Sequence, residues 1–211
     1  MKKFLSKYIE FILLALCILL LLSKPEMPLY GDRICMVMFA TLALYYLASG
    51  ILVFLDKYRI TRNMRLLYMF GLWAVAMIVL AVLARTTLVQ MNYELLLICV
   101  SSLFAVSIFS LFIYNGTEPE KKPSISAQLQ PLITRCVIAF FIGIGFLLID
   151  PYTVYKLFGT YRSDAVYIDK IIRVYENPED TILKNELIRY EEILKGRERR
   201  MDTRDSSLHL Q

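Results

Sequence analysis

Histidine is almost absent from this sequence of 211 residues, which contains only one, His209. General acid–base catalysis most often uses a histidine, and zinc sites commonly include imidazole ligands. The sequence also lacks a glycine-rich phosphate-binding loop, a G-x-S-x-G nucleophile elbow and an H-E-x-x-H zinc motif. We therefore predict a non-enzymatic protein that has no catalytic residues and needs neither a cofactor nor a metal ion.

Cysteine is also sparse, and its four copies never form a C-x-x-C pair. Cys17, Cys35, Cys99 and Cys136 all lie in or beside apolar runs. This pattern excludes a small disulfide-stapled secreted domain and a thioredoxin-like redox motif. We interpret the four side chains as small buried apolar groups.

Carboxylates are rare within the apolar part of the chain, where Glu10 is the only acidic candidate. Pumps and ion-coupled transporters usually place carboxylates or histidines deep in the bilayer. Lys7 precedes Glu10 by about one helical turn, so we expect a local ion pair between them. For Arg135 we expect a side chain that extends to the lipid headgroups, with pairing to a lipid phosphate or to Glu10 as alternatives.

Hydrophobic residues are abundant, at 57% of the chain, and they are concentrated in residues 1–150. A helix needs about 20 mostly apolar residues to cross a bilayer. Residues 1–150 are therefore predicted to form a transmembrane bundle of five helices. The first is expected to be a retained anchor, because residues 21–24 lack the small-x-small pattern of a signal-peptidase site. The predicted spans are about residues 5–23, 34–55, 66–84, 95–114 and 131–149.

The basic residues predict the orientation of this bundle, because short loops rich in lysine and arginine stay cytoplasmic. One side carries ten of them and the other side three. The N-terminus is therefore expected in the cytoplasm and the tail after residue 150 outside it; a re-entrant fifth segment, which would leave the tail inside, is the alternative. The ten are Lys2, Lys3, Lys7, Lys57, Arg59, Arg62, Arg65, Lys121, Lys122 and Arg135, and the three are Lys24, Arg33 and Arg85.

Hydroxyl groups recur on one face of the second span. Thr41, Tyr45 and Ser49 are spaced at i, i+4 and i+8, so they share a face of the helix. A phenol at that depth needs a hydrogen-bond partner, because lipid supplies none. We predict a polar intramembrane seam, for which hydrogen bonding between helices is the first interpretation. The alternative is a path for a neutral or weakly polar solute.

The tail, residues 151–211, begins with an aromatic segment at 151–161 that suits the membrane–water interface. Two amphipathic helices are predicted after it. Ser163 or Asp164 is expected to cap the first helix, and Asn177 to cap the second, with Pro178 at its first position. Residues 151–200 are thus predicted to form the interfacial segment and a helical hairpin, and residues 201–211 to be disordered.

Each helix of the predicted hairpin has one apolar stripe. Two short helices that bury only each other are marginally stable in water, so part of this surface is expected to contact something else. We consider a protein partner, a second copy of the chain, or the chain's own bundle. The tail carries equal numbers of basic and acidic residues, so no nucleic acid is expected. The predicted partner-binding residues are Ile168, Ile171, Ile172, Leu183, Leu187, Tyr190 and Leu194.

Together these patterns predict an all-α integral membrane protein of the cell membrane, with a five-helix bundle and a C-terminal amphipathic helical hairpin. The function expected first is that of a non-enzymatic multi-pass subunit or scaffold, in contact with the lipid bilayer, whose hairpin mediates assembly with a partner or a homo-oligomer. The alternative is a small transporter or channel for a neutral or weakly polar solute.

Overall fold

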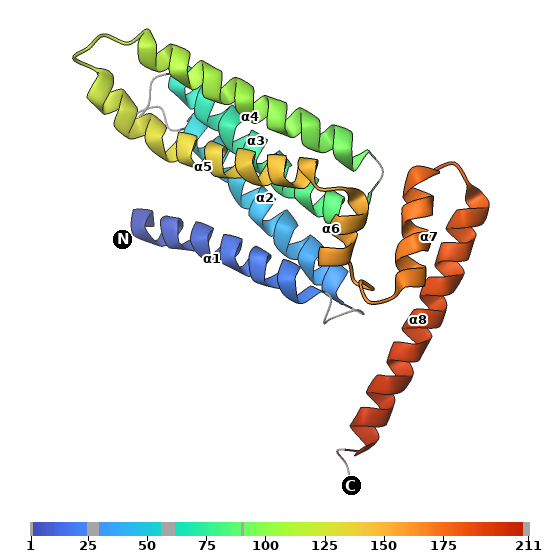
Figure 1. Cartoon of the computed structure of the whole chain (residues 1–211). Helices are drawn as coiled ribbons and strands as arrows, with labels where there is room; N and C mark the ends of the chain where they lie inside the picture. Colours follow the sequence, from blue (N-terminus) through green and yellow to red (C-terminus); the bar gives the residue numbers. More distant parts are fainter. Residues whose placement is uncertain (1, 25–29, 56–61, 90, 209–211) are drawn as a thin grey trace.

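The computed structural model is all-helical over the residues that the structure describes, which are 2–24, 30–55, 62–89 and 91–208. No β-strand occurs in these ranges. The helices are labelled in Figure 1. They are α1 (Lys2–Ser23), α2 (Gly31–Leu55), α3 (Arg62–Thr86), α4 (Asn92–Asn115), α5 (Lys122–Leu148), α6 (Pro151–Phe158), α7 (Ala165–Glu176) and α8 (Thr181–Leu208).

Four helices are long and apolar enough to cross a membrane: α2, α4, α5 and the part of α3 from Met64 to Thr86. The described apolar part of α1, Tyr8–Ser23, is shorter. The predicted all-α class and the membrane-protein class therefore agree with these four helices. A fifth span through α1 stays a prediction.

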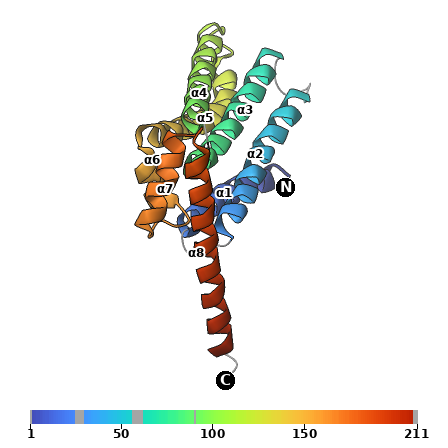
Figure 2. The ribbon, with the colours of Figure 1, turned by 90° about the vertical axis from the view of Figure 1, so that its right-hand side faces the viewer.

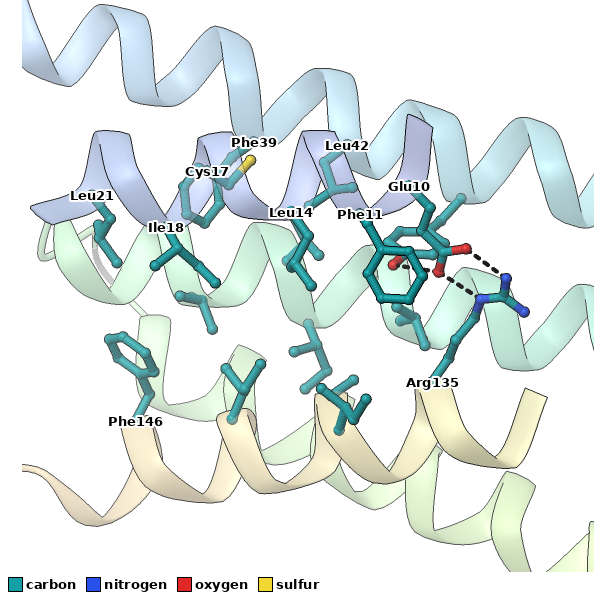
Figure 3. Close-up of a pocket in the computed structure, with 18 residues that line it drawn as sticks. Glu10, Phe11, Leu14, Cys17, Ile18, Leu21, Phe39, Leu42, Arg135 and Phe146 are labelled. Carbon is teal, nitrogen blue, oxygen red and sulfur yellow. Dashed lines mark hydrogen bonds and ion pairs between the residues drawn. The ribbon is translucent and has the colours of Figure 1, made fainter. Parts of the chain in front are cut away.

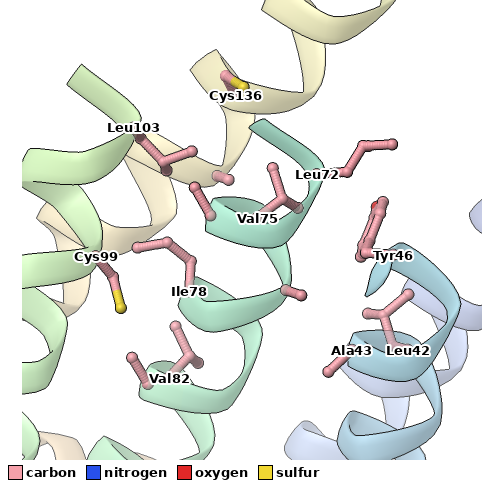
Figure 4. Packing of buried hydrophobic residues seen from close by; sticks show 14 of the residues in the cluster. Leu42, Ala43, Tyr46, Leu72, Val75, Ile78, Val82, Cys99, Leu103 and Cys136 are labelled. Carbon is pink, nitrogen blue, oxygen red and sulfur yellow. The ribbon is translucent and has the colours of Figure 1, made fainter. Parts of the chain in front are cut away.

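Helix α3 is the centre of the bundle and packs against α2, α4 and α5, while α1 packs against α2 (Figure 1). In its most apolar stretch, 56% of α3 is buried, against 22% to 33% for the other three long helices. Figure 4 shows the core around α3, where Val75 and Ile78 share one cluster with Leu42 of α2, Leu103 of α4 and Cys136 of α5. All the cysteines are buried and free, which confirms their interpretation as apolar core residues.

The outer helices keep large apolar side chains on their outward faces. Leu44 of α2, Ile98 of α4 and Phe141 of α5 are each more than 60% exposed. Exposed apolar surface on this scale is unusual for a soluble monomer, whereas in a bilayer it meets lipid chains. This surface supports the membrane interpretation independently of helix length.

Helix α5 begins nine residues before the predicted span at 131–149, because Pro123 sits in its first turn and Pro131 is accommodated inside the helix. It then continues without a break to Leu148. Helix α5 is long and apolar enough to cross a membrane, while the side on which the tail lies stays a prediction.

The caps of the tail helices correct part of the prediction. Asp164 does cap α7, accepting a hydrogen bond from the Tyr167 N–H at 2.9 Å. The second helix, however, starts at Thr181 and is capped by Asp180 rather than Asn177. Asn177 instead ends α7, where its N–H donates to the Arg173 carbonyl. Asp180 is preferred because its carboxylate accepts two backbone N–H bonds of the first turn and its charge suits the positive helix end.

Two further features of the tail are seen only in the structure. The aromatic segment forms a short helix, α6, because Asp150 caps it and Pro151 occupies its first position. Helix α8 passes through Gly196 and continues to Leu208, whereas disorder was predicted from residue 201. The segment after Gly196 contains four arginines, which have high helix propensity and extend an existing helix at little cost. Residues 209–211 of the predicted disordered segment lie outside the described residues.

The tail helices lie at the end of the bundle where α2 begins and where α3 and α5 end (Figure 1). Helices α7 and α8 run antiparallel and pack on each other, and we call them the α7–α8 pair. Figure 2 shows that α8 extends well beyond the bundle. The tail thus combines a segment docked on the bundle with a helical arm that projects from it.

Candidate functional site

A buried ion pair joins three helices inside the bundle. Glu10 of α1 accepts two hydrogen bonds from Arg135 of α5, from Nε at 2.6 Å and from Nη2 at 2.5 Å. It also accepts one from the hydroxyl of Tyr46 of α2 at 3.1 Å. Figure 3 shows Arg135 reaching across from α5 towards α1. We call Glu10, Tyr46 and Arg135 the Glu10 cluster.

This arrangement decides between the alternatives that the sequence left open for Arg135, in favour of pairing with Glu10. Lys7, which was expected to pair with Glu10, has a side chain outside the described residues. Glu10 is only 7% exposed. A carboxylate at that burial is costly unless an opposite charge and hydrogen bonds compensate it, and the bidentate guanidinium supplies both.

An apolar cavity of about 300 Å³ lies beside the Glu10 cluster. Its walls come from α1, α2, α3 and α5, and Glu10 and Arg135 close one end of it (Figure 3). Phe11, Leu14 and Ile18 of α1 face the α5 side, where Phe146 lies at the far end of the cavity. The cavity is therefore long and apolar, and one end of it is formed by an ion pair that carries no net charge.

A second cavity, of about 180 Å³, lies on the other side of the same cluster and is more polar. Tyr45, Ser49 and Tyr68 line it together with all three members of the Glu10 cluster. The Tyr68 hydroxyl donates to the Gln128 carbonyl. The Glu10 cluster thus lines both cavities, the apolar one and the hydroxyl-lined one.

The structure brings together two residues of the predicted polar seam. Tyr45 and Ser49 both line the polar cavity. Thr41 is exposed, and its hydroxyl donates to the Val37 carbonyl of its own helix at 2.7 Å. Three serine hydroxyls of α4, at positions 102, 107 and 110, likewise donate to carbonyls of α4.

The predicted partner-binding residues gather in the α7–α8 pair, mostly facing inward. Ile168 and Leu194 are buried, and they share a cluster with Leu88, Tyr155 and Tyr167 from the bundle end, α6 and α7. Leu183 is half-buried outside that cluster. Contact with another protein stays a prediction for all seven residues. The remaining four, partly buried against the cluster, are Ile171, Ile172, Leu187 and Tyr190.

A buried arginine docks the α7–α8 pair on the bundle. Arg85 at the end of α3 is 2% exposed, and its guanidinium donates to the Asn92 side chain and to the Ile149 carbonyl, each at 2.8 Å. The Tyr175 hydroxyl of α7 donates to the same Asn92 oxygen at 3.2 Å. Sequence reasoning counted Arg85 only as an orientation signal. The clue in the sequence to a structural role was that Arg85 lies where a predicted span meets a short loop.

A second buried cation lies at the same end of the bundle. Lys24 forms an ion pair with Asp32 at 2.7 Å, and the hydroxyl of Thr160 donates to the other Asp32 oxygen at 2.7 Å. The Lys24 side chain is 1% exposed. This contact links the end of α1, the start of α2 and the segment after α6. This end of the bundle is thus bonded to the tail at two separate places, around Arg85 and around the Lys24–Asp32 pair.

Burial raises the pKa of Tyr155 and of Tyr167, and the nearby Glu191 carboxylate, which accepts the Tyr167 hydroxyl hydrogen at 2.8 Å, adds to the rise for Tyr167. The folded state therefore holds phenol protons that the unfolded state releases near pH 10, the usual pKa of tyrosine. Because the unfolded state then binds fewer protons, the free energy of unfolding falls as pH rises above about 10 and is unaffected by these groups below it.

We expect this pH dependence in thermal unfolding of the detergent-solubilised chain, followed together with tyrosinate absorbance. The double variant Tyr155→Phe/Tyr167→Phe is expected to weaken the alkaline loss of stability. Tyr152→Phe is the matched control, because Tyr152 of α6 is 48% exposed. Equal alkaline loss in the double variant and the wild type would contradict the prediction.

Comparison with known proteins adds no relative to this geometry: no protein-family model, no curated protein and no solved structure matches the chain. Within the part of the chain that the structure describes, no three His, Cys, Asp or Glu side chains come together to hold a metal ion. A functional conclusion therefore rests on the Glu10 cluster, its two cavities and the docked tail.

Proposed function

We propose that this chain is a non-enzymatic multi-pass membrane subunit or scaffold whose α7–α8 pair, the predicted amphipathic hairpin, mediates assembly. The observation that carries the proposal is the projection of α8 beyond the bundle (Figure 2). A helix of 28 residues whose distal part leaves its own bundle presents a long side surface to another chain. The buried contacts of Arg85 and Lys24 hold the base of this arm in place.

We further propose five membrane crossings, with α1 as the first. Its 22 residues span about 33 Å at 1.5 Å per residue, close to the hydrocarbon thickness of about 30 Å. Helix α1 ends beside the start of α2, as the Lys24–Asp32 pair indicates. On the basis of the basic loops, we propose that the N-terminus lies in the cytoplasm and the arm outside it, with the bundle in the cell membrane.

The surface proposed for assembly differs from the inward stripe of the predicted partner residues. Ile182 and Ile193 are 70% and 51% exposed, and their separation of eleven residues puts them on one flank of α8. Helix α8 carries seven basic and six acidic residues over 181–208. A helix with nearly balanced charge does not repel a second copy of itself, and a two-fold interface brings the same patch of both copies together, so we commit to a second copy of this chain as the partner.

The test is the mass of the full chain in nanodiscs, measured by light scattering. We expect a dimer for the wild type and a monomer for Ile182→Asp/Ile193→Asp, because two buried carboxylates without partners oppose association. The matched control is Val166→Asp/Ile188→Asp, since these side chains are 53% and 54% exposed but lie off that flank. A monomeric wild type, or equal dissociation by both double variants, would overturn the proposal. Substitution of Leu187 or Leu194 is avoided, because both pack within the α7–α8 cluster itself.

A second candidate function is handling of a neutral or weakly polar solute. The observation that favours it is the polar cavity, where Tyr45 and Ser49 of the predicted seam meet the Glu10 cluster. Thr41 points elsewhere, so the seam supports a pocket around the cluster more directly than a continuous path along α2.

A further inference from the structure

We propose that the apolar cavity between α1 and α5 binds a neutral membrane amphiphile, with its apolar chain along α1 and a carbonyl oxygen of its polar end at the Arg135 guanidinium. This site is independent of the assembly proposed for α8. It rests on three features: the shape of the cavity, the hydrogen-bonding capacity of Arg135 and the net charge of the Glu10 cluster.

The shape fits a single apolar chain. Along α1 the cavity runs from Glu10 to Leu21, which is about 17 Å at 1.5 Å per residue. That length is about half of the roughly 30 Å hydrocarbon core, the depth that an acyl chain fills in one leaflet. The volume of about 300 Å³ is at the lower end of the range for small-molecule sites. Figure 3 shows its wall side chains as predominantly hydrocarbon between the ion pair and Phe146.

Arg135 has hydrogen-bonding capacity left over. A guanidinium carries five N–H donors. Two of them bind Glu10, and one binds the Pro131 carbonyl at 3.3 Å. The two other donors bond no residue among those that the structure describes, and the Arg135 side chain remains 31% exposed beside the cavity. Donors left without a partner in a partly buried site are costly, so an oxygen of a bound molecule at Arg135 would be favoured.

The charge of the cluster selects a neutral polar end. Glu10 and Arg135 together carry no net charge, and the Tyr46 hydroxyl adds none. A carboxylate placed at Arg135 would also lie close to Glu10, and two like charges repel strongly in a medium of low dielectric constant. A carbonyl oxygen accepts the free guanidinium hydrogens without that repulsion. The polar cavity lined by Tyr45 and Ser49 leaves room for the rest of a small polar group.

The probe is a photoreactive monoacylglycerol, which is neutral and has an ester carbonyl, added to the full chain in phosphatidylcholine nanodiscs. We expect saturable labelling that maps to peptides of α1 and α5. A fatty acid of the same chain length, kept ionised, is expected to compete about tenfold less well than unlabelled monoacylglycerol, which corresponds to roughly 1.4 kcal/mol. Labelling that does not saturate, or equal competition by the fatty acid, would overturn the proposal.

Two variants of the same helix test the position of the site. Ile18 lines the cavity and is 51% exposed, whereas Ile12 is 56% exposed and does not line it. Ile18→Trp is expected to fill the cavity and reduce labelling about tenfold, while Ile12→Trp leaves it unchanged. Equal labelling of both variants would rule out this cavity as the site.

A third variant tests the charge argument. Glu10→Gln leaves Arg135 without its countercharge and makes the cluster net positive, so the preference is expected to invert in favour of the fatty acid. An unchanged preference for the monoacylglycerol in a folded Glu10→Gln protein would overturn the role given to net charge. If this variant does not fold, the Ile18 and Ile12 pair still decides the proposal.

Discussion

Replacing Arg135 with leucine is expected to lower the free energy of unfolding by about 3–5 kcal/mol, the range for breaking a buried ion pair by removing one partner. The reason is the carboxylate left behind. Glu10 is 7% exposed. Among the residues that the structure describes, only the Tyr46 hydroxyl would still donate a hydrogen bond to it. The measurement is thermal or denaturant unfolding of the full chain in detergent micelles.

The double variant Glu10→Leu/Arg135→Leu is the informative control. It removes both charges and fills the space with apolar side chains, which is often neutral for stability. We expect it to recover most of the loss, apart from about 1 kcal/mol for the Tyr46 hydroxyl that loses its acceptor. Arg173→Leu is the control for a surface pair, because Arg173 and its partner Asp169 are 62% and 58% exposed. A double variant as unstable as Arg135→Leu would show that the buried charge is not the cause.

Replacing Arg85 with methionine is expected to undock the α7–α8 pair from the bundle. The substitution removes the donors to the Asn92 side chain and the Ile149 carbonyl, both at the junction of α3, α4 and α5 with the tail. Hydrogen bonds from a charged donor contribute about 1.5–3 kcal/mol each, although relief of the buried charge offsets part of this. We expect amide hydrogen exchange in α6 and α7 to rise by about tenfold or more, while the core of α3 stays protected.

The same exchange experiment with Arg173→Met provides the matched control, because this arginine lies exposed on α7 and forms only an i, i+4 pair. Little change is expected there, as for most surface substitutions. If Arg85→Met leaves exchange in α7 unchanged, the apolar cluster around Leu88 and Tyr155 would be sufficient for docking. If exchange rises equally in α3, Arg85 would stabilise the bundle as a whole.

Local sequence patterns predicted the helices of the bundle well but their ends less well. The apolar runs at 34–55, 66–84 and 95–114 each lie inside an observed helix, because a run of that length has few other conformations available in lipid. The extension of α5 before Pro131 was missed, since a proline inside a helix usually signals an end. The choice of Asp180 over Asn177 as a cap depended on where the turn after α7 placed the chain.

The candidate site was predicted only in part, and for a similar reason. Tyr45 and Ser49 were found because residues four apart share a helix face. Lys7 was the expected partner of Glu10, and pairing with Arg135 was only an alternative, because Arg135 is 125 residues away and no local pattern measures that distance. The inward orientation of Ile168 and Leu194 likewise required the position of α6 and of Leu88.

The sequence by itself determined the all-helical class, the position of the long apolar helices and the amphipathic character of the tail, because each follows from composition and period over neighbouring residues. The tertiary structure alone decided which charges meet inside the bundle, that Arg85 donates hydrogen bonds to Asn92 and Tyr175, and that α8 leaves the bundle as an arm. Those features depend on how whole helices pack. Packing is a property of surfaces that are brought together only when the chain has folded.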